Sequence, residues 1–303
     1  MKRVINFMGI RRVAFAATLV LTLLSLVSLA VRGLNFGLDF TGGTLIELSY
    51  ERPVELSDVR AGLETAGYGD ALVQSFGATT DVLVRLKGDD PQLGERVASA
   101  LRQSASDNPM TVKRAEFVGP AVGEELRDQG AGHAAGAGGI LVYVAFRFQW
   151  KFGCGAVLSL FHDVIVTLGV FSFLQIPFDL TVLAAVLAII GYSLNDTIVV
   201  FDRIRENFRL LRKADLVENI NISTTQTLLR TMATSISTLL AILALMLFGG
   251  EPLWGFSLAL FIGVMAGTYS SIYIANVVLI WLKLTRDDLI PPVAQEAETD
   301  LRP

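Results

Sequence analysis

The chain has 303 residues, of which 52% are hydrophobic and 18% are charged, whereas soluble domains average roughly 45–50% apolar and about 25% charged residues. This composition excludes an ordinary soluble protein and, short tails aside, a disordered chain. The formal net charge of −4 without a basic domain argues against nucleic-acid binding, and one cysteine with two histidines is too few for a disulfide framework or a structural zinc site.

The first apolar run covers residues 13–31 and follows a basic N-terminus. A run of roughly 17–25 apolar residues is long enough to span a bilayer. A cleaved signal peptide is the competing interpretation, since residues 28–30 (SLA) resemble a cleavage site, but the apolar core of a signal peptide is normally about 7–15 residues long. We therefore expect residues 1–34 to form a cytosolic N-terminus and an uncleaved transmembrane helix.

Residues 35–130 are polar and alternate between strand-like and helix-like segments. Ser57 is a plausible N-cap for the first of the helices. The order βαββαβ is the split pattern of ferredoxin-like α+β domains. Strand composition is found at residues 44–50, 71–76, 81–86 and 111–117, and helical patterns at residues 57–66 and 91–104.

From residue 131 onward the chain is apolar again, and residues 131–284 complete a predicted six-helix membrane protein. Residues 285–303 are acidic, contain two adjacent prolines and are expected to be a disordered cytosolic tail. The five further spans are predicted at residues 131–148, 152–174, 180–201, 228–248 and 254–282. Glycines on two of them let helices pack closely: Gly132, Gly136, Gly139, Gly263 and Gly267.

The loops between the predicted helices give their orientation. Lys and Arg residues flank the N-terminus, the second–third loop, the fourth–fifth loop and the end of the sixth helix, whereas the loops 175–179 and 249–252 have none. By the positive-inside rule, both termini lie in the cytosol. The domain formed by residues 35–130 is then expected on the outer face of the membrane.

Ionisable residues within the predicted spans are the most informative feature, because each is costly to bury in lipid. They are His162, Asp163, Asp196 and Arg230. Asp196 and Arg230 lie at similar depth on antiparallel neighbours, where a buried carboxylate resists ionisation and a nearby arginine favours it. This pattern predicts a proton relay, with a fixed Asp196–Arg230 pair that only locks two helices together as the alternative.

Hydroxyl side chains accompany these two charges. Ser193 and Thr197 share a helical face with Asp196, and Thr234 shares one with Arg230, because they are three or four residues apart. Aligned hydroxyls of this kind could order water along a proton path. Sodium as the coupling ion stays open, since carboxylate and hydroxyl oxygens suit either ion.

The sequence carries no signature of a hydrolase or an ATPase, and we expect neither enzymatic activity nor a cofactor. A GxxxxGK[ST] phosphate loop, a GxSxG elbow and an HExxH motif are absent. Asp163 and Asp196 lack the Gly-Xaa-Gly-Asp setting of an intramembrane aspartyl protease. For His162 and its neighbour Asp163, titration and simple hydrogen bonding both stay open. The segment 37–44 (GLDFTGGT) is expected to be a tight turn that enters the first strand.

The predicted order of elements is one helix, a large outer domain and five further helices. This order resembles one half of the resistance–nodulation–division transporters, which carry proton-binding acids on the fourth helix of a half. Residues 190–207 (IGYSLNDTIVVFDRIREN) resemble the fourth-helix signature of the SecF family, the smaller membrane subunits of the SecDF accessory complex of bacterial protein export. Residues 35–44 (NFGLDFTGGT), 227–231 (TLLRT) and 248–250 (FGG) resemble further motifs of that family.

This resemblance implies a SecD partner and association with the SecYEG channel, a YajC-like accessory subunit and the preprotein in the bacterial inner membrane. Proton flow at the SecD–SecF interface would drive outer domains that pull or hold the emerging preprotein at a late stage of translocation. Asp196 would bind the proton and Arg230 would modulate the pKa of Asp196. Asn195, Ser193 and Thr234 would orient water or hydrogen-bond the Asp196 carboxylate. The alternatives are a half-size proton-driven exporter of a small molecule or lipid, and an assembly scaffold.

Overall fold

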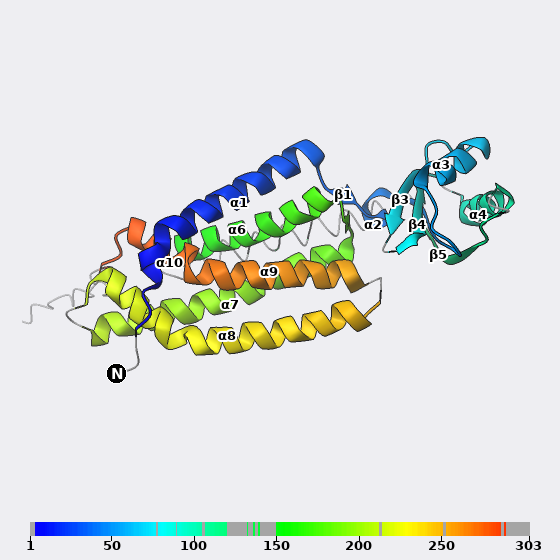
Figure 1. Cartoon of the computed structure of the whole chain (residues 1–303). Helices are drawn as coiled ribbons and strands as arrows, with labels where there is room; N and C mark the ends of the chain where they lie inside the picture. The colour runs from blue at the N-terminus through cyan, green and yellow to red at the C-terminus, as the bar shows by residue number, and fades with distance from the viewer. Residues whose placement is uncertain are drawn as a thin grey trace, which may run out of the picture. The chain divides into compact units, whose positions relative to one another are not determined.

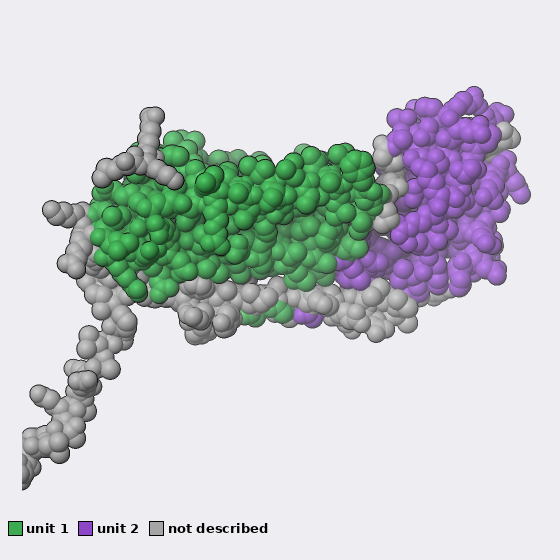
Figure 2. All heavy atoms as spheres, turned by 90° about the horizontal axis from the view of Figure 1, so that it is seen from below, with its two compact units in different colours: residues 1–34, 134–176, 181–303 green, residues 35–133, 177–180 purple. Residues whose placement is uncertain are grey.

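The computed structural model describes residues 4–119 except 77, 89, 105 and 106, then 132, 136 and 139, then 150–285 except 212, 213, 251 and 252, and residue 288. The chain divides into two compact units, coloured separately in Figure 2. The helical unit comprises Met1–Leu34, Ala134–Ile176 and Thr181–Pro303, and the sheet unit comprises Asn35–His133 and Pro177–Leu180.

The helical unit is built from long apolar helices that run alongside one another (Figure 1). Within the described residues, five helical stretches are long and apolar enough to cross a membrane. Helix α6 packs against α1, α9 and α10, and α8 packs against α9. The helices are η1 (Phe7–Ile10), α1 (Arg11–Arg32), α6 (Trp150–Leu174), α7 (Leu180–Leu210), α8 (Leu216–Phe248), α9 (Trp254–Ile272) and α10 (Ile274–Trp281).

Three of these helices differ from the predicted bounds. Helix α7 continues to Leu210 because its last turns are amphipathic and bury Ile204 and Phe208. Helix α8 begins twelve residues before the predicted start, where the Asp215 side chain accepts a hydrogen bond from the Glu218 backbone N–H at 2.7 Å. The predicted last span is divided at Tyr273 into α9 and α10.

Two predicted segments fall mainly outside the described residues. The helix predicted at 131–148 is described only at three glycines, and the predicted tail only at Thr285 and Asp288. Asp288 forms an ion pair with Lys151, whose Nζ lies 2.6 Å from its Oδ2. This hydrogen bond, with others from Thr285, lowers the pKa of Asp288 to about 2.

The N-terminal segment is hydrogen-bonded to the start of α8. The Met8 backbone N–H donates to Asn221 Oδ1 at 2.9 Å, and Asn221 Nδ2 donates to Asn6 Oδ1 at 3.1 Å. The Ile5 backbone N–H donates to Thr225 Oγ1 at 3.1 Å. Because Met8 is also fully buried in the helical core, residues 5–8 are an integral part of this unit.

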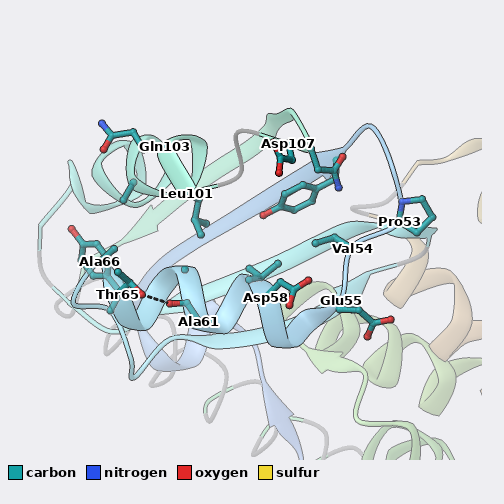
Figure 3. Close-up of a pocket in the computed structure, with 16 residues that line it drawn as sticks. Pro53, Val54, Glu55, Asp58, Ala61, Thr65, Ala66, Leu101, Gln103 and Asp107 are labelled. Carbon is teal, nitrogen blue, oxygen red and sulfur yellow. Dashed lines mark hydrogen bonds between the residues drawn. The ribbon is translucent and has the colours of Figure 1, made fainter.

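The sheet unit contains a four-stranded antiparallel sheet in the order β3-β4-β2-β5, with α3 and α4 packed on one face (Figure 3). Alternate strand residues and one face of each helix form its apolar core, which includes Ile46, Leu48, Val84, Leu63 and Leu101. The elements are β2 (Gly43–Tyr50), α3 (Leu56–Thr65), β3 (Leu72–Phe76), β4 (Ala78–Leu86), α4 (Leu93–Ser104) and β5 (Met110–Val118).

The predicted cap of α3 was wrong. The N-cap is Glu55, without a capping side-chain hydrogen bond, and Ser57 lies inside the first turn. The expected turn at residues 37–44 instead contains a short helix, α2 (Leu38–Thr41). Strand β1 (Asn35–Phe36) precedes it and pairs in parallel with β6 (Pro177–Phe178), a contact between residues about 140 positions apart that local sequence patterns do not reveal.

Candidate functional site

Asp163 on α6 is the centre of a buried hydrogen-bond cluster that joins three helices. Its side chain is fully buried, and its Oδ2 accepts from Ser193 Oγ on α7 at 2.6 Å and from Ser270 Oγ on α9 at 2.8 Å. Its Oδ1 lies 3.0 Å from His162 Nδ1. Ser159 Oγ donates in turn to Ser270 at 2.8 Å. Both oxygens of Asp163 are therefore already engaged.

Close helix packing makes this cluster possible. A Cβ atom placed on Gly267 of α9 would lie 3.1 Å from the Cβ of Ser193, and one on Gly263 would lie only 2.2 Å from Ile189 Cδ1. These glycines bring α7 and α9 close enough for Ser193 and Ser270 to reach the same carboxylate oxygen. The close packing expected of Gly263 and Gly267 thus has a direct consequence for the site.

Asp196 on α7 forms a second polar site with α8, in which the carboxylate accepts fewer hydrogen bonds than that of Asp163. The side chain is 3% exposed, and the α8 groups that act on it are the charge of Arg230 and the hydroxyl of Ser235. Its Oδ2 is buried and accepts no hydrogen bond from the described residues. Ser235 Oγ lies 2.8 Å from Thr268 Oγ1 on α9, so hydroxyl groups extend from this carboxylate across α8 to α9.

Arg230 is exposed on the surface of α8 rather than enclosed with Asp196. In the part of the chain that the structure describes, no ion pair with an N···O distance within 4.0 Å joins the two side chains. The charge of the guanidinium therefore acts on the carboxylate through space, without a direct ion pair. A fixed ion pair that locks α7 to α8 is not formed.

The structure separates several of the accompanying residues from Asp196. Ser193 donates to Asp163, Asn195 is exposed, and Thr234 Oγ1 donates to the backbone carbonyls of its own helix. Thr197 is 1% exposed on the same helix as Asp196. Asp163 and Asp196 accordingly belong to two adjacent sites that share α7.

Ser235, Thr268 and Ser270 were not singled out from the sequence. Each interrupts an apolar helix, and Thr268, Ser270 and the intervening Tyr269 form a polar run within α9 directly after Gly267. Polar side chains in a membrane-spanning helix normally face protein rather than lipid. That rule could have directed attention to this run, but it does not specify which carboxylate each hydroxyl contacts.

The sheet unit carries an open groove of about 850 Å³ between α3 and α4 (Figure 3). Its lining includes the apolar side chains of Val54 and Leu101 and the acidic side chains of Glu55, Asp58 and Asp107. The sixteen lining residues include no Lys, Arg, His or Cys. Among the described residues of the whole chain, no group of three or more His, Cys, Asp or Glu side chains could hold a metal ion.

Comparison with known proteins matches two family models to the chain. The model described as "Protein export membrane protein SecD/SecF, C-terminal" matches residues 97–285, and the model described as "SecD/SecF GG Motif" matches residues 27–54. A relative from Pseudomonas aeruginosa, named protein translocase subunit SecF, is 69% identical over 98% of this chain and 97% of its own length. The protein of the same name from Escherichia coli O157:H7 is 44% identical over 99% of this chain and 94% of its own length.

Two solved structures of SecDF resemble the chain. The crystal structure of SecDF from Thermus thermophilus, "a translocon-associated membrane protein", is 43% identical in sequence with a TM-score of 0.83. A structure of SecDF in a "Super-membrane-facing form" is 42% identical with a TM-score of 0.68. In both comparisons the match covers 93% of this chain but only 39% of the SecDF chain.

Proposed function

The chain belongs to the SecF subunits of the SecD/SecF family of protein-export membrane proteins, and from this premise we propose that it conducts protons through Asp196 to drive late-stage preprotein translocation. An accessory role in Sec-dependent protein export comes with the family. The use of the proton-motive force and the residues that serve it are the proposal.

The main support for assigning the proton site to Asp196 is the contrast between the two buried carboxylates. Both oxygens of Asp163 are engaged, two hydroxyls donating to its Oδ2, so a proton added there would displace an existing bond. Asp196 has a buried oxygen that accepts no hydrogen bond from the described residues. It can therefore gain and lose a proton with little rearrangement, and Arg230 can tune that exchange by approaching or withdrawing.

We further propose that SecD covers the outward face of α7 and α8. Asn195 and Arg230 are exposed within candidate membrane spans, where contact of polar side chains with lipid is costly. A second membrane subunit would remove both from lipid and would complete the proton path. Association with SecYEG, a YajC-like subunit and the translocating preprotein follows from family resemblance.

The proposed setting is the bacterial inner membrane, with both termini in the cytosol and the sheet unit on the outer face. The distribution of Lys and Arg among the loops supports this orientation. We place a sixth span at residues 131–148, and we assign the sheet unit to the ferredoxin-like class. The strand order β3-β4-β2-β5 with two helices on one face supports that assignment.

The test is preprotein translocation into inverted membrane vesicles that contain the SecD complex and saturating ATP. The native chain and Asp196→Asn are compared with and without an imposed proton gradient. We expect the gradient-dependent part of translocation to disappear in Asp196→Asn while the ATP-only part remains. Asp202→Asn is the matched control, because Asp202 is an exposed acid on the same helix and its ion-pair partner, Arg205, lies 3.7 Å away.

An equal response of the native chain and Asp196→Asn to the gradient would refute the role of Asp196. Repeating the assay with a sodium gradient separates the two coupling ions. A small-molecule or lipid exporter would instead show normal secretion and altered resistance to lipophilic toxins when the chain is depleted. Full activity of a neutral Asp196→Asn and Arg230→Gln double variant would favour a scaffold.

A further inference from the structure

The glycine-rich segment at residues 37–44 has no part in the proposed proton site, yet it is hydrogen-bonded to residues 178 and 180, far along the chain. Strand β1, helix α2, strand β6 and the residues Asp179 and Leu180 pack together, and we call this group the joint. All of them belong to the sheet unit. Leu180 is also the first residue of α7, the helix that carries Asp196.

Two hydrogen bonds attach the motif to the segment that starts α7. The Gly37 backbone N–H donates to the Phe178 carbonyl at 2.8 Å. The Leu180 backbone N–H donates to Asp39 Oδ2 at 2.9 Å. The first N–H groups of a helix have no partner inside the helix, and a carboxylate there also interacts favourably with the helix dipole. Asp39 therefore caps α7 from a position 141 residues earlier in the chain.

Aromatic packing makes the joint compact. The ring centroids of Phe36, Phe40 and Phe178 lie 5.7–6.2 Å apart, and Phe178 is only 6% exposed. Gly37 is required by space, because a Cβ atom there would lie 3.0 Å from the Cβ of Asp179 and 3.2 Å from its Cα. A side chain at this position would push β1 and β6 apart.

The joint is also anchored to the main sheet. Arg85 on β4 donates from Nη1 to the Phe36 carbonyl at 2.6 Å and to Asn35 Oδ1 at 3.4 Å. By contrast, the connection from α1 into the sheet unit runs through Gly33, which has a φ of +66° and no atom within 4 Å of a Cβ built on it. The residues of the joint are thus held by hydrogen bonds and ring packing, whereas no atom lies where a side chain at Gly33 would begin.

We propose that the joint is the mechanical link between the proton site and the sheet unit, and that Asp39 is its positioning residue. Helix α7 is continuous from Leu180 to Leu210, so Asp196 lies sixteen residues, or about 24 Å, along the helix from the Asp39 cap. A shift of α7 on proton exchange reaches the sheet through the cap, β6, β1 and Arg85. The inference rests on the proposed function, because it assumes that α7 moves when Asp196 exchanges its proton.

The test compares Asp39→Ala with Asp39→Asn in the assembled complex. An asparagine Oδ1 can still accept the Leu180 hydrogen bond, whereas alanine removes the acceptor. Asp70→Ala is the matched control, because Asp70 is an exposed acid of the same unit. Two quantities are measured: hydrogen exchange at the backbone amides of residues 180–183, and translocation into inverted vesicles with and without a proton gradient.

In Asp39→Ala, we expect exchange at residues 180–183 to accelerate about fivefold, the size that loss of one capping hydrogen bond implies. The gradient-dependent part of translocation should fall severalfold, while ATP-only translocation and co-purification with SecD stay at native levels. Asp39→Asn and Asp70→Ala should keep both quantities close to native. A purely structural role would lower ATP-only and gradient-dependent translocation together.

Native gradient-dependent translocation in Asp39→Ala would overturn the inference, and so would its loss without faster exchange at residues 180–183. The exchange measurement does not involve Asp196, so the two hypotheses fail separately. If Asp196→Asn keeps the gradient response, the proposed proton path is wrong. If Asp196→Asn loses the response and Asp39→Ala keeps it, the joint alone is wrong.

Discussion

The contact between α7 and α9 at Gly263 is a tight packing position next to the helices that carry the two carboxylates. A Cβ atom at Gly263 would lie 2.2 Å from Ile189 Cδ1, 2.3 Å from its Cγ1 and 2.8 Å from its Cγ2. Three atoms of one β-branched side chain block the space, and Ile189 is 1% exposed, so few other rotamers are open to it. In a Gly263→Ala variant, we expect the helices themselves to separate.

The size of the effect follows from these distances. Non-bonded carbon atoms are in best contact at about 3.5–4.0 Å, so α7 and α9 must move apart by roughly 1.5 Å. Asp163 Oδ2 accepts from Ser193 on α7 at 2.6 Å and from Ser270 on α9 at 2.8 Å, and one of these bonds would exceed the usual limit of about 3.2 Å. Overpacking costs about 1–3 kcal/mol, and losing a hydrogen bond to a charged group adds about 1.5–3 kcal/mol.

Thermal unfolding of the assembled complex in detergent, at one fixed scan rate, measures this cost. The two costs together are about 2.5–6 kcal/mol. At roughly 2–4 °C per kcal/mol, we expect Gly263→Ala to lower the Tm by about 5–24 °C. Gly191→Ala is the matched control, because Gly191 lies on α7 with no atom within 4 Å of the added Cβ. In an Ile189→Ala background, Gly263→Ala should cost far less. A Tm within about 1 °C of native, or an undiminished cost in that background, would refute the packing argument.

Two further predictions concern groups with a strong local partner. Hydrogen bonds from Lys113 Nζ at 2.8 Å and Ser49 Oγ at 2.7 Å lower the pKa of Asp81. The folded sheet unit therefore gains stability from ionised Asp81 above pH ~4 and loses it as the pH falls through the lowered pKa. Asp81→Asn should flatten this acid dependence, measured as hydrogen-exchange protection in β4. Ser270→Ala removes one of two hydroxyl donors to the fully buried Asp163 oxygen and should cost about 1–3 kcal/mol in unfolding of the complex.

Each of these two predictions has a control in the chain. Asp58→Asn, at an exposed acid of the same unit, should leave the acid dependence unchanged. Ser237→Ala should change the free energy of unfolding by less than about 0.5 kcal/mol, because Ser237 is exposed and its hydroxyl donates only to the Thr234 carbonyl of its own helix. A pH profile of Asp81→Asn that matches the native one, or equal costs for Ser270→Ala and Ser237→Ala, would contradict the respective argument.

Local patterns predicted the regular elements well. Strands at 44–50 and 81–86 were within three residues of β2 and β4, because alternation of apolar and polar residues is a property of each segment alone. The bounds of α6 were within two residues because a long apolar run is likewise a property of its own segment. The start of α8 was missed although Asp215 and Glu218 carry a capping signal, because residues 216–227 are too polar to be part of an apolar span.

The candidate site was predictable in its charges but not in its partners. Hydropathy alone makes Asp163, Asp196 and Arg230 conspicuous. The assignment of Ser193 depends on which way α7 is rotated about its axis against α6 and α9, and that rotation is set by Gly263 and Gly267 rather than by the spacing of Ser193 from Asp196. Spacing identifies residues on one helical face, whereas only tertiary packing decides which neighbour that face meets.

The hydrogen bonds between the N-terminal residues and α8 impose an order on biogenesis. Met8 and Asn221 are 213 residues apart, and at a synthesis rate of about 5–20 residues per second the ribosome makes the second partner roughly 10–40 s after the first. Throughout that interval the newly made residues 5–8 are without the α8 groups they finally bind. Closure of this contact is consequently a late step of assembly, and a tag fused at the N-terminus would act on that step before it could act on transport.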